Sequence, residues 1–410
     1  MDSKTWNSIE LFSGAGGLAL GLTEAGLRHQ AVVEWDRHAC ATLSANARYH
    51  NTSAPWPVYE RDVRTFDYTP YADHIELLAA GVPCQPFSLG GKHNGHRDGR
   101  NMFPEVTRAI RELRPKIVII ENVKGLLREK FRDYFDYVLL SLRMPELRVR
   151  AEETWWEHAA RLRLEATEGT YSDLAYNVSY QLINCADYGV PQLRERVFMT
   201  AVRADLGAQW KPLQPTHCED ALLWAQWIDG SYWKEHGLQA RKLPPRLKAR
   251  VEGLNAEIFP RLHRWQTVRD ALRRLPEPAA YQEHTAFDNH VANPGARSYL
   301  GHSGSPYDWP SKTLKAGVHG VPGGENTLRF SNGRVRYFSV REAARIQTFP
   351  DDYRFRGAWC ECMRQLGNAV PVRIGRILGD QASEILRAVS KSDSYCVSES
   401  PSLQISCVGD

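Results

Sequence analysis

Short apolar runs alternate with helical periodicity over the first 125 residues of the chain. The apolar runs predict strands at 8–12, 30–34, 58–61, 75–80 and 116–120. The segments between them predict helices at 18–25, 39–49 and 101–113. The last apolar run, KIVII, is rich in β-branched residues, which is typical of a strand buried on both faces. This repeated order of strand and helix predicts an α/β fold with a parallel, doubly wound sheet.

The pattern changes twice further along the chain. Residues 126–170 are mainly helical and charged, and their sequence indicates no function. From about 205 to 336, Trp, Pro, His and basic residues dominate and no period is sustained, which predicts a second domain. The tail from Ser390 is rich in Ser, lacks periodicity and is predicted to be disordered. The remaining predicted elements are strands at 178–184 and 197–202 and helices at 340–347 and 372–388.

Composition narrows the class of protein. The 410 residues are 42% hydrophobic and 24% charged, which is ordinary for a globular protein. No apolar run approaches the ~20 residues that span a bilayer, and no secretory signal is visible at the N-terminus. The eight cysteines are scattered and form no CxxC pair, which argues against a disulfide framework and a zinc site. We expect a reduced, intracellular protein without a metal.

Basic residues gather in the second domain. The net charge is only +4, but Lys and Arg outnumber Asp and Glu by eleven to four over residues 234–274. Trp224, Trp227, Trp233 and Trp265 lie in or beside this stretch. Basic side chains interleaved with aromatics suit a nucleic-acid surface. A solvated helix face with tryptophans packed behind it explains the same pattern equally well.

A glycine-rich turn follows the first predicted strand, in ELFSGAGGLALGL at 10–22. Glycines let the backbone approach a ligand, and a helix N-terminus offers free N–H groups. The spacing fits neither the dinucleotide fingerprint nor the P-loop. Glu34 and Trp35 end the second strand, where such folds bind ribose, and Asp62 follows the third. Each acid alone could be a helix cap, but together they indicate an adenosine-containing cofactor.

A second set of polar residues stands at later strand ends. Cys84 follows the strand at 75–80 in a proline-framed turn, and Glu121 ends the neighbouring strand. A thiol at this edge of the sheet is a candidate nucleophile, although free cysteines are more often small buried hydrophobes. Gln192, Arg194 and Arg196 alternate before the strand at 197–202, so they are predicted to point together. Surface salt bridges with Glu195 are the alternative for the two arginines.

Six segments resemble the motif set of the DNA (cytosine-5) methyltransferases. They occur in the family's order, and their spacing spans most of residues 8–380. The segments are FSGAGG (12–17), PCQPFS (83–88), ENV (121–123), QLRER (192–196), RYFSVREAARIQTFPDDY (336–353) and QLGNAVPVRIG (365–375). The resemblance implies a Rossmann-like S-adenosylmethionine-dependent methyltransferase sheet with a smaller, irregular target-recognition domain. It implies a discontinuous catalytic domain at 1–204 and 362–389, a recognition domain at 205–361 and a disordered tail at 390–410.

The resemblance also assigns the cofactor, S-adenosyl-L-methionine. The residues that it implies at the cofactor are Phe12, Gly14, Ala15, Gly16, Gly17, Leu18, Glu34, Trp35, Asp62, Val63, Pro83, Asn368 and Ala369. In this assignment Glu34 binds the ribose, Trp35 the adenine face, and Asp62 with Val63 the adenine edge.

The implied reaction is methylation of C5 of a flipped-out cytosine in duplex DNA. Cys84 adds to C6 and makes C5 nucleophilic, while Glu121 neutralises charge at N3 and holds the exocyclic amine. Arg196 is favoured for O2 of the base and Arg194 for support, although the sequence does not separate the two. The implied DNA contacts are Gln85, Ser88, Lys92, Arg97 and Arg100. The turn-rich segment 309–326 is a further candidate for base or backbone contacts.

A chain made of little more than a catalytic domain and a recognition domain resembles the bacterial modification enzymes. We therefore expect a cytoplasmic, nucleoid-associated monomer that acts on double-stranded DNA and protects it from a cognate restriction endonuclease, with no membrane association. One alternative is an RNA cytosine-5 methyltransferase, although the tRNA-directed branch has a shorter recognition region and a Cys-Phe-Thr signature. A second is a non-catalytic DNA-binding homologue, which the presence of Cys84, Glu121 and both arginines disfavours. A NAD-linked oxidoreductase would need a glycine spacing that is absent.

Overall fold

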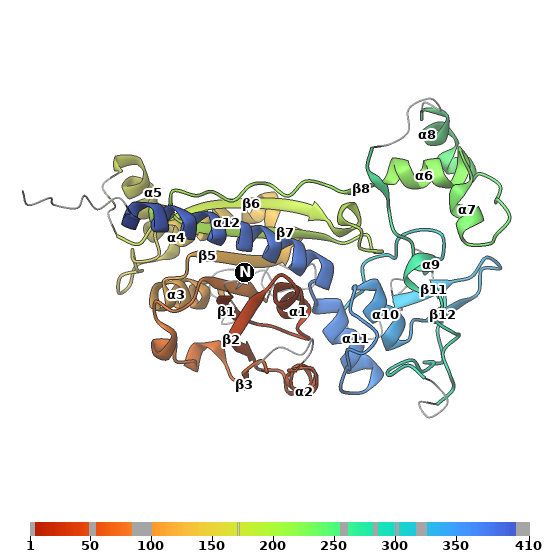
Figure 1. The fold of residues 1–410 in the computed structure, drawn as a ribbon, viewed down its shortest axis with the longest axis horizontal. Coiled ribbons are helices and arrows are strands. Elements are labelled where there is room, and N and C mark those ends of the chain that lie inside the picture. Colours follow the sequence, from red (N-terminus) through yellow and green to blue (C-terminus); the bar gives the residue numbers. More distant parts are fainter. Residues whose placement is uncertain are drawn as a thin grey trace, which may run out of the picture.

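A seven-stranded sheet in the order β3-β2-β1-β4-β5-β7-β6 forms the centre of the computed structural model (Figure 1). The strands are β1 (Trp6–Leu11), β2 (Leu27–Glu34), β3 (Val58–Glu60), β4 (Leu77–Gly81), β5 (Ile117–Val123), β6 (Tyr176–Asn184) and β7 (Glu195–Arg203). The structure describes residues 5–48, 55–83, 101–169, 171, 173–254, 261–281, 286–298, 300, 303–316 and 326–398.

The first five strands are parallel, as predicted. β7 runs antiparallel to β5, and β6 runs antiparallel to β7 at the edge of the sheet. The sheet is therefore mixed, and its purely parallel part ends at β5. The two late strands were predicted, but nothing in their apolar pattern indicated their direction.

Helices cover both faces of the sheet because successive strand residues point to opposite sides. On one face Ile9, Leu78 and Ile120 pack with α3 (Phe103–Leu113) and α4 (Arg132–Arg143). On the other face Leu77 and Ile119 pack with two helices from opposite ends of the chain, α1 (Gly17–Glu24) and α12 (Val372–Ser398). The other two helices of this half are α2 (Arg37–Ala45) and α5 (Trp155–Glu168).

The contact between α1 and α12 depends on glycines in both helices. Gly17 and Gly21 repeat in α1 with three residues between them, and Gly375 and Gly379 do the same in α12. A Cβ on Gly21 would lie 2.4 Å from the carbonyl oxygen of Val372. The two backbones therefore touch where a side chain would otherwise stand, and the last helix closes directly over the glycine-rich turn.

The C-terminal part of the chain differs from its prediction in two helices. α12 continues to Ser398, past the predicted end at 388 and into the segment predicted to be disordered. α11 (Trp359–Asn368) was not predicted, and its last carbonyls are held by residues that lie far away in the sequence. α10 (Val340–Ile346) was predicted, and Ser339 caps it in a capping box with Glu342.

The irregular region between β7 and α10 contains short elements. They are α6 (Glu219–Trp227), α7 (Ser231–Glu235), α8 (Lys248–Glu252), α9 (Val268–Ala271), β8 (His217–Cys218), β9 (His263–Arg264), β10 (Ser305–Pro306), β11 (Thr327–Arg329) and β12 (Val335–Tyr337). α6, α7 and α8 lie apart from the large sheet, at one end of the molecule (Figure 1). One apolar cluster joins residues of this region, such as Leu314, to Ala15 and Leu43 beside the sheet. The predicted domain boundaries stay a prediction.

Candidate active site

A cavity of about 520 Å³ lies at the carboxyl ends of β1, β2, β4 and β5. This is the edge where open α/β sheets bind their ligands. Ten of the thirteen residues predicted at the cofactor line it. They are Phe12, Gly14, Leu18, Glu34, Trp35, Asp62, Val63, Pro83, Asn368 and Ala369. The ends of these four strands and the end of α11 thus meet at one cavity.

Ala15, Gly16 and Gly17 were also predicted at the cofactor, but they are not among the residues that line the cavity. They contact the C-terminal part of the chain instead. The hydroxyl of Tyr353 donates to the carbonyl oxygen of Ala15 at 2.7 Å. A Cβ on Gly17 would lie 2.1 Å from the carbonyl oxygen of Val370. In this turn, the glycines make room for backbone as well as for a ligand.

Glu34 links the glycine-rich turn to the end of β2 through hydrogen bonds to backbone N–H groups. Its carboxylate accepts backbone N–H groups from Gly14 at 2.7 Å and from Trp35 and Asp36 at 2.9 Å. Burial raises the pKa of Glu34, and these amide hydrogen bonds oppose the rise. Glu34 does not cap α2, since Asp36 does so by accepting from His38 and Ala39. The indole of Trp35 is 67% exposed and free to receive a ligand against its face.

Asp62 is a helix cap, as the sequence allowed, and its predicted contact with a cofactor stays a prediction. It caps a short 3₁₀ helix, Val63–Thr65, and it lines the cavity. The guanidinium of Arg64 donates to both of its carboxylate oxygens, which lowers the pKa of Asp62.

Glu121 and Arg196 form an ion pair at the inner end of the same cavity, with 2.7 Å between Arg196 Nε and Glu121 Oε1. Both side chains are largely buried, at 9% and 12% exposure. Glu121 lies beside Gly81 in the β4–β5 register, and Asn122 donates to the carbonyl oxygen of Val82. Pro83, the last described residue before the predicted nucleophile, lines the cavity as well. Cys84 itself lies outside the described residues.

Gln192 and Arg194 do not share the cavity with Arg196. β7 begins only at Glu195, so the predicted strand alternation does not extend back to these two residues. Both side chains are fully buried and bond to other segments of the chain. Glu195, the alternative partner for the arginines, instead pairs with Lys124 at 2.8 Å.

The predicted DNA contacts fall mostly where the structure gives no description. Gln85, Ser88, Lys92, Arg97 and Arg100 lie outside the described residues, and so does 317–325 within the candidate segment 309–326. Their assignment stays a prediction.

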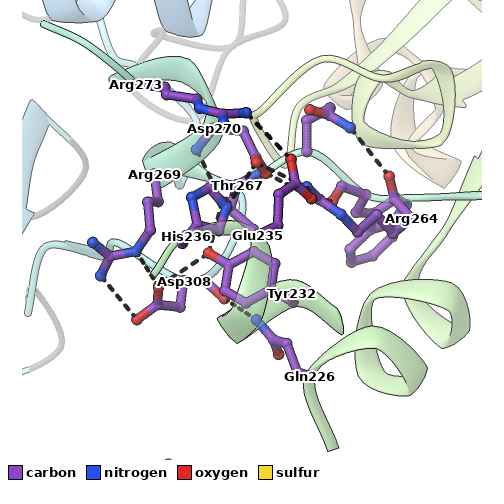
Figure 2. Close-up of polar contacts among 12 residues, drawn as sticks. Gln226, Tyr232, Glu235, His236, Arg264, Thr267, Arg269, Asp270, Arg273 and Asp308 are labelled. Atoms are coloured by element: carbon purple, nitrogen blue, oxygen red, sulfur yellow. Dashed lines mark hydrogen bonds and ion pairs between the residues drawn. The ribbon is translucent and has the colours of Figure 1, made fainter. Parts of the chain in front are cut away.

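The basic stretch of the second domain is largely engaged in contacts within the protein (Figure 2). Arg264 donates to both carboxylate oxygens of Asp270 and pairs with Glu235 at 2.9 Å. Arg269 pairs with Asp308 at 2.6 Å. These two arginines pair with acids of the same region, an arrangement that neither sequence interpretation described, and the nucleic-acid surface stays a prediction. Three of the four tryptophans are buried in the same region: Trp224, Trp233 and Trp265.

Glu10 is a cavity residue that sequence reasoning missed. Its side chain is buried in β1, and the backbone N–H of Ala19 donates to it. Burial raises the pKa of Glu10 well above its usual value. Its Oε2 atom has no hydrogen-bond partner among the described residues. An acid inside a buried strand was the available signal, because such a residue is rarely placed there without a partner.

Two structural absences concern only the described residues. Within these ranges no three His, Cys, Asp or Glu side chains are grouped so that they could hold a metal ion. None of the helices found there combines the length and apolarity that a membrane crossing requires.

Sheet and cavity together define a Rossmann-like methyltransferase fold. Mutant DNMT2 of Spodoptera frugiperda shares the fold, with a TM-score of 0.54 at 18% identity over 94% of this chain and 99% of that one. The family model of C-5 cytosine-specific DNA methylases matches residues 6–147 and 158–384.

Curated relatives agree with the family match. Type II methyltransferase M.Eco47II of Escherichia coli is 32% identical over 399 residues, which is 95% of this chain and 82% of that protein. Type II methyltransferase M.NgoMIV of Neisseria gonorrhoeae is 32% identical over 391 residues, which is 95% of this chain and 99% of that protein. The chain therefore belongs to the C-5 cytosine-specific DNA methylase family, and it is a DNA (cytosine-5)-methyltransferase.

Proposed function

We propose that this enzyme transfers a methyl group from S-adenosylmethionine to C5 of a flipped-out cytosine at a specific sequence in duplex DNA. The observation that carries the proposal is the shared cavity. One end of it has an acid and an exposed indole, Glu34 and Trp35, and the other end has the Glu121–Arg196 ion pair. A nucleoside-type cofactor and a base edge can therefore meet in one cavity.

The residues present fit S-adenosylmethionine. Glu34, Trp35 and Asp62 suit its ribose, adenine face and adenine amine. The buried, unpartnered Oε2 of Glu10 suits a cationic group such as the amine of an amino acid. When bound, this cofactor supplies a methyl group that is electrophilic enough for an activated C5 to attack.

Cys84 is proposed as the nucleophile. Its thiolate forms a bond to C6, and the ring electrons shift toward C5, which then carries the methyl group. Loss of the C5 proton restores the double bond and expels the thiolate. Glu121 can accept from the exocyclic amine of cytosine and share a proton at N3, and Arg196 can donate to O2. The ion pair thus presents an acceptor and a donor to the edge of one base.

Base flipping follows from the burial of this pair. A stacked cytosine cannot reach side chains of 9% and 12% exposure, so the base must leave the duplex at a cost of a few kcal/mol. Gln85, Ser88, Lys92, Arg97 and Arg100 remain the proposed DNA contacts.

The test is nucleoside analysis. Purified enzyme is incubated with unmethylated genomic DNA and S-adenosylmethionine, and the digested nucleosides are analysed by mass spectrometry. We expect 5-methylcytosine with the wild type, none with Cys84→Ser, and a loss of at least a hundredfold in rate with Glu121→Gln. Failure to modify DNA while S-adenosylhomocysteine binds would exclude the DNA reaction. Parallel incubation with total RNA tests the RNA alternative, and sequencing of the product reveals the site.

The biological setting is proposed from the relatives, which are named Type II methyltransferases. We propose a cytoplasmic, nucleoid-associated monomer that protects DNA from a cognate endonuclease, with the catalytic domain at 1–204 and 362–389 and the recognition domain at 205–361. Light scattering in solution tests the monomer. Cleavage of modified and unmodified plasmid by a neighbouring endonuclease tests the protection.

A further inference from the structure

Arg194 is an unusual residue because it is a fully buried cation without an acidic partner. Its exposure is zero, and within the described ranges its guanidinium forms no ion pair. Burial lowers its pKa, and the nearby charge of Arg196 lowers it further. A buried, unpaired charge is costly, and an apolar residue of the same size would often be more stable. Stability alone therefore does not explain an arginine at this position.

The guanidinium is aimed at three carbonyl oxygens on two distant segments. Nη2 donates to Gly367 at 2.8 Å and to Ala369 at 2.9 Å, and Nη1 donates to Leu314 at 3.3 Å. Gly367 and Ala369 belong to the end of α11, where the last carbonyls of a helix have no intrahelical partner. A cation is also favourable at this negative end of the helix dipole.

Two buried glutamines complete the junction. Gln347 donates to the carbonyl oxygens of Leu366 and Ala369, at 2.5 and 3.2 Å. Gln192 accepts the N–H of Leu314 at 3.0 Å and donates to Gln347 at 3.1 Å. Gly367 packs so closely here that a Cβ on it would lie 2.3 Å from the nitrogen of Ala316.

The helix end held in this way forms a wall of the cavity, because Gly367, Asn368, Ala369 and Val370 all line it. We propose that Arg194 is a positioning residue for the cofactor wall, whereas Arg196 alone of the two acts at the base. Arg194 fixes the turn 367–369 against Leu314 and never enters the cavity. The inference rests on the proposed S-adenosylmethionine site.

The experiment separates cofactor affinity from turnover. Calorimetric titration gives the Kd of S-adenosylhomocysteine for wild type, Arg194→Lys, Arg194→Met and the matched control Arg196→Lys. We expect the Kd to rise at least tenfold in Arg194→Met and less in Arg194→Lys, which keeps the charge and part of the bonding. We expect Arg196→Lys to change the Kd less than threefold while kcat at saturation falls at least a hundredfold.

Hydrogen exchange of amides 366–370 is the second readout. Arg194→Met should raise the exchange rate of these amides and leave the exchange rate of the β1 amides unchanged. A general loss of stability would raise both rates. Gln347 also donates to carbonyl oxygens of this turn, so Gln347→Leu should raise the exchange of the same amides. This variant replaces Arg194→Met in the test if Arg194→Met does not fold.

The outcomes are distinct. Unchanged Kd and exchange with a collapse of kcat in Arg194→Lys would overturn the inference and make Arg194 a catalytic residue. A wild type that does not bind S-adenosylhomocysteine would refute the proposed cofactor site, and the inference would fall with it.

Discussion

His29 is a buried side chain whose protonation is expected to weaken the fold at low pH. Its Nε2 donates to the carbonyl oxygen of Ala19 at 2.9 Å, and its Nδ1 accepts from the hydroxyl of Ser8 at 3.0 Å. This arrangement satisfies the neutral ring. Burial lowers the pKa of His29 from 6.5 to about 4, although the Ala19 hydrogen bond opposes that change. Protonation therefore favours the unfolded chain.

We expect the free energy of unfolding to fall as the pH drops from 6.5 toward 4. In this window the unfolded chain binds a proton at His29 that the folded chain does not, which costs the fold about 3 kcal/mol by pH 4. Above pH 6.5 both states are neutral there and the effect vanishes. Urea unfolding of wild type and His29→Gln from pH 4 to 7 measures it. Equal acid slopes in the two proteins would contradict the prediction.

Single residues also show which parts of the site could be predicted from the sequence and which could not. Glu34, Asp62 and Glu121 could be singled out because each stands at or just after the end of a predicted strand, and all three line the cavity. Ala15, Gly16 and Gly17 were assigned to the ligand, yet they contact Tyr353 and the backbone near Val370. A glycine in a sequence indicates that another group packs closely against the backbone there, but it does not indicate whether that group is a ligand or another part of the chain.

At the scale of elements, the packing of α1 against α12 depends on how closely the two helix backbones approach each other. A Cβ on Gly21 would meet the carbonyl oxygen of Val372 at 2.4 Å, whereas a Cβ on Gly375 would lie 3.1 Å from that of Leu18. We expect Gly21→Ala to destabilise the protein by about 3 kcal/mol through overpacking. Gly375→Ala should cost about 1 kcal/mol or less, because helix propensity offsets a mild contact. Thermal unfolding of both variants checks the order, and equal losses would show that the contact adjusts freely.

The elements that were predicted well are those whose pattern is set locally. β1 to β5 and α3 carry apolar residues at the period of a strand or a helix, and their predicted bounds lie close to the observed ones. The direction of β6 and β7 depends on connections and was not readable. α11 depends on Arg194 and Gln347 to hold its last carbonyls, and those partners lie far away in the sequence.

At the scale of the whole molecule, an arginine that is paired within the protein should contribute to stability but not to DNA binding. Arg264 is 17% exposed and bound to Asp270 and Glu235. We expect Arg264→Met to lower the free energy of unfolding by about 3 kcal/mol, because the largely buried carboxylate of Asp270 loses its arginine partner. It should leave the slope of log affinity against log salt unchanged, because that arginine neutralises no phosphate.

The control for this prediction is Arg246→Met, at an exposed position, which should leave stability unchanged within about 0.5 kcal/mol. DNA binding between 50 and 200 mM salt and urea unfolding are measured for each variant. A shallower salt slope in Arg264→Met would show that the arginine leaves its partners for DNA.

The position of α12 has a consequence for how the enzyme is made. Ile374, Leu378 and Leu386 cover a sheet face whose strands, β7 included, are all built from residues 6–203. On the ribosome, α12 cannot cover this face until residues 372–386 have been translated. The cavity wall at 367–370 arrives equally late. A nascent chain therefore cannot assemble the site before α12 emerges, and a message interrupted before α12 yields a fragment with an uncovered apolar sheet rather than a partly active enzyme.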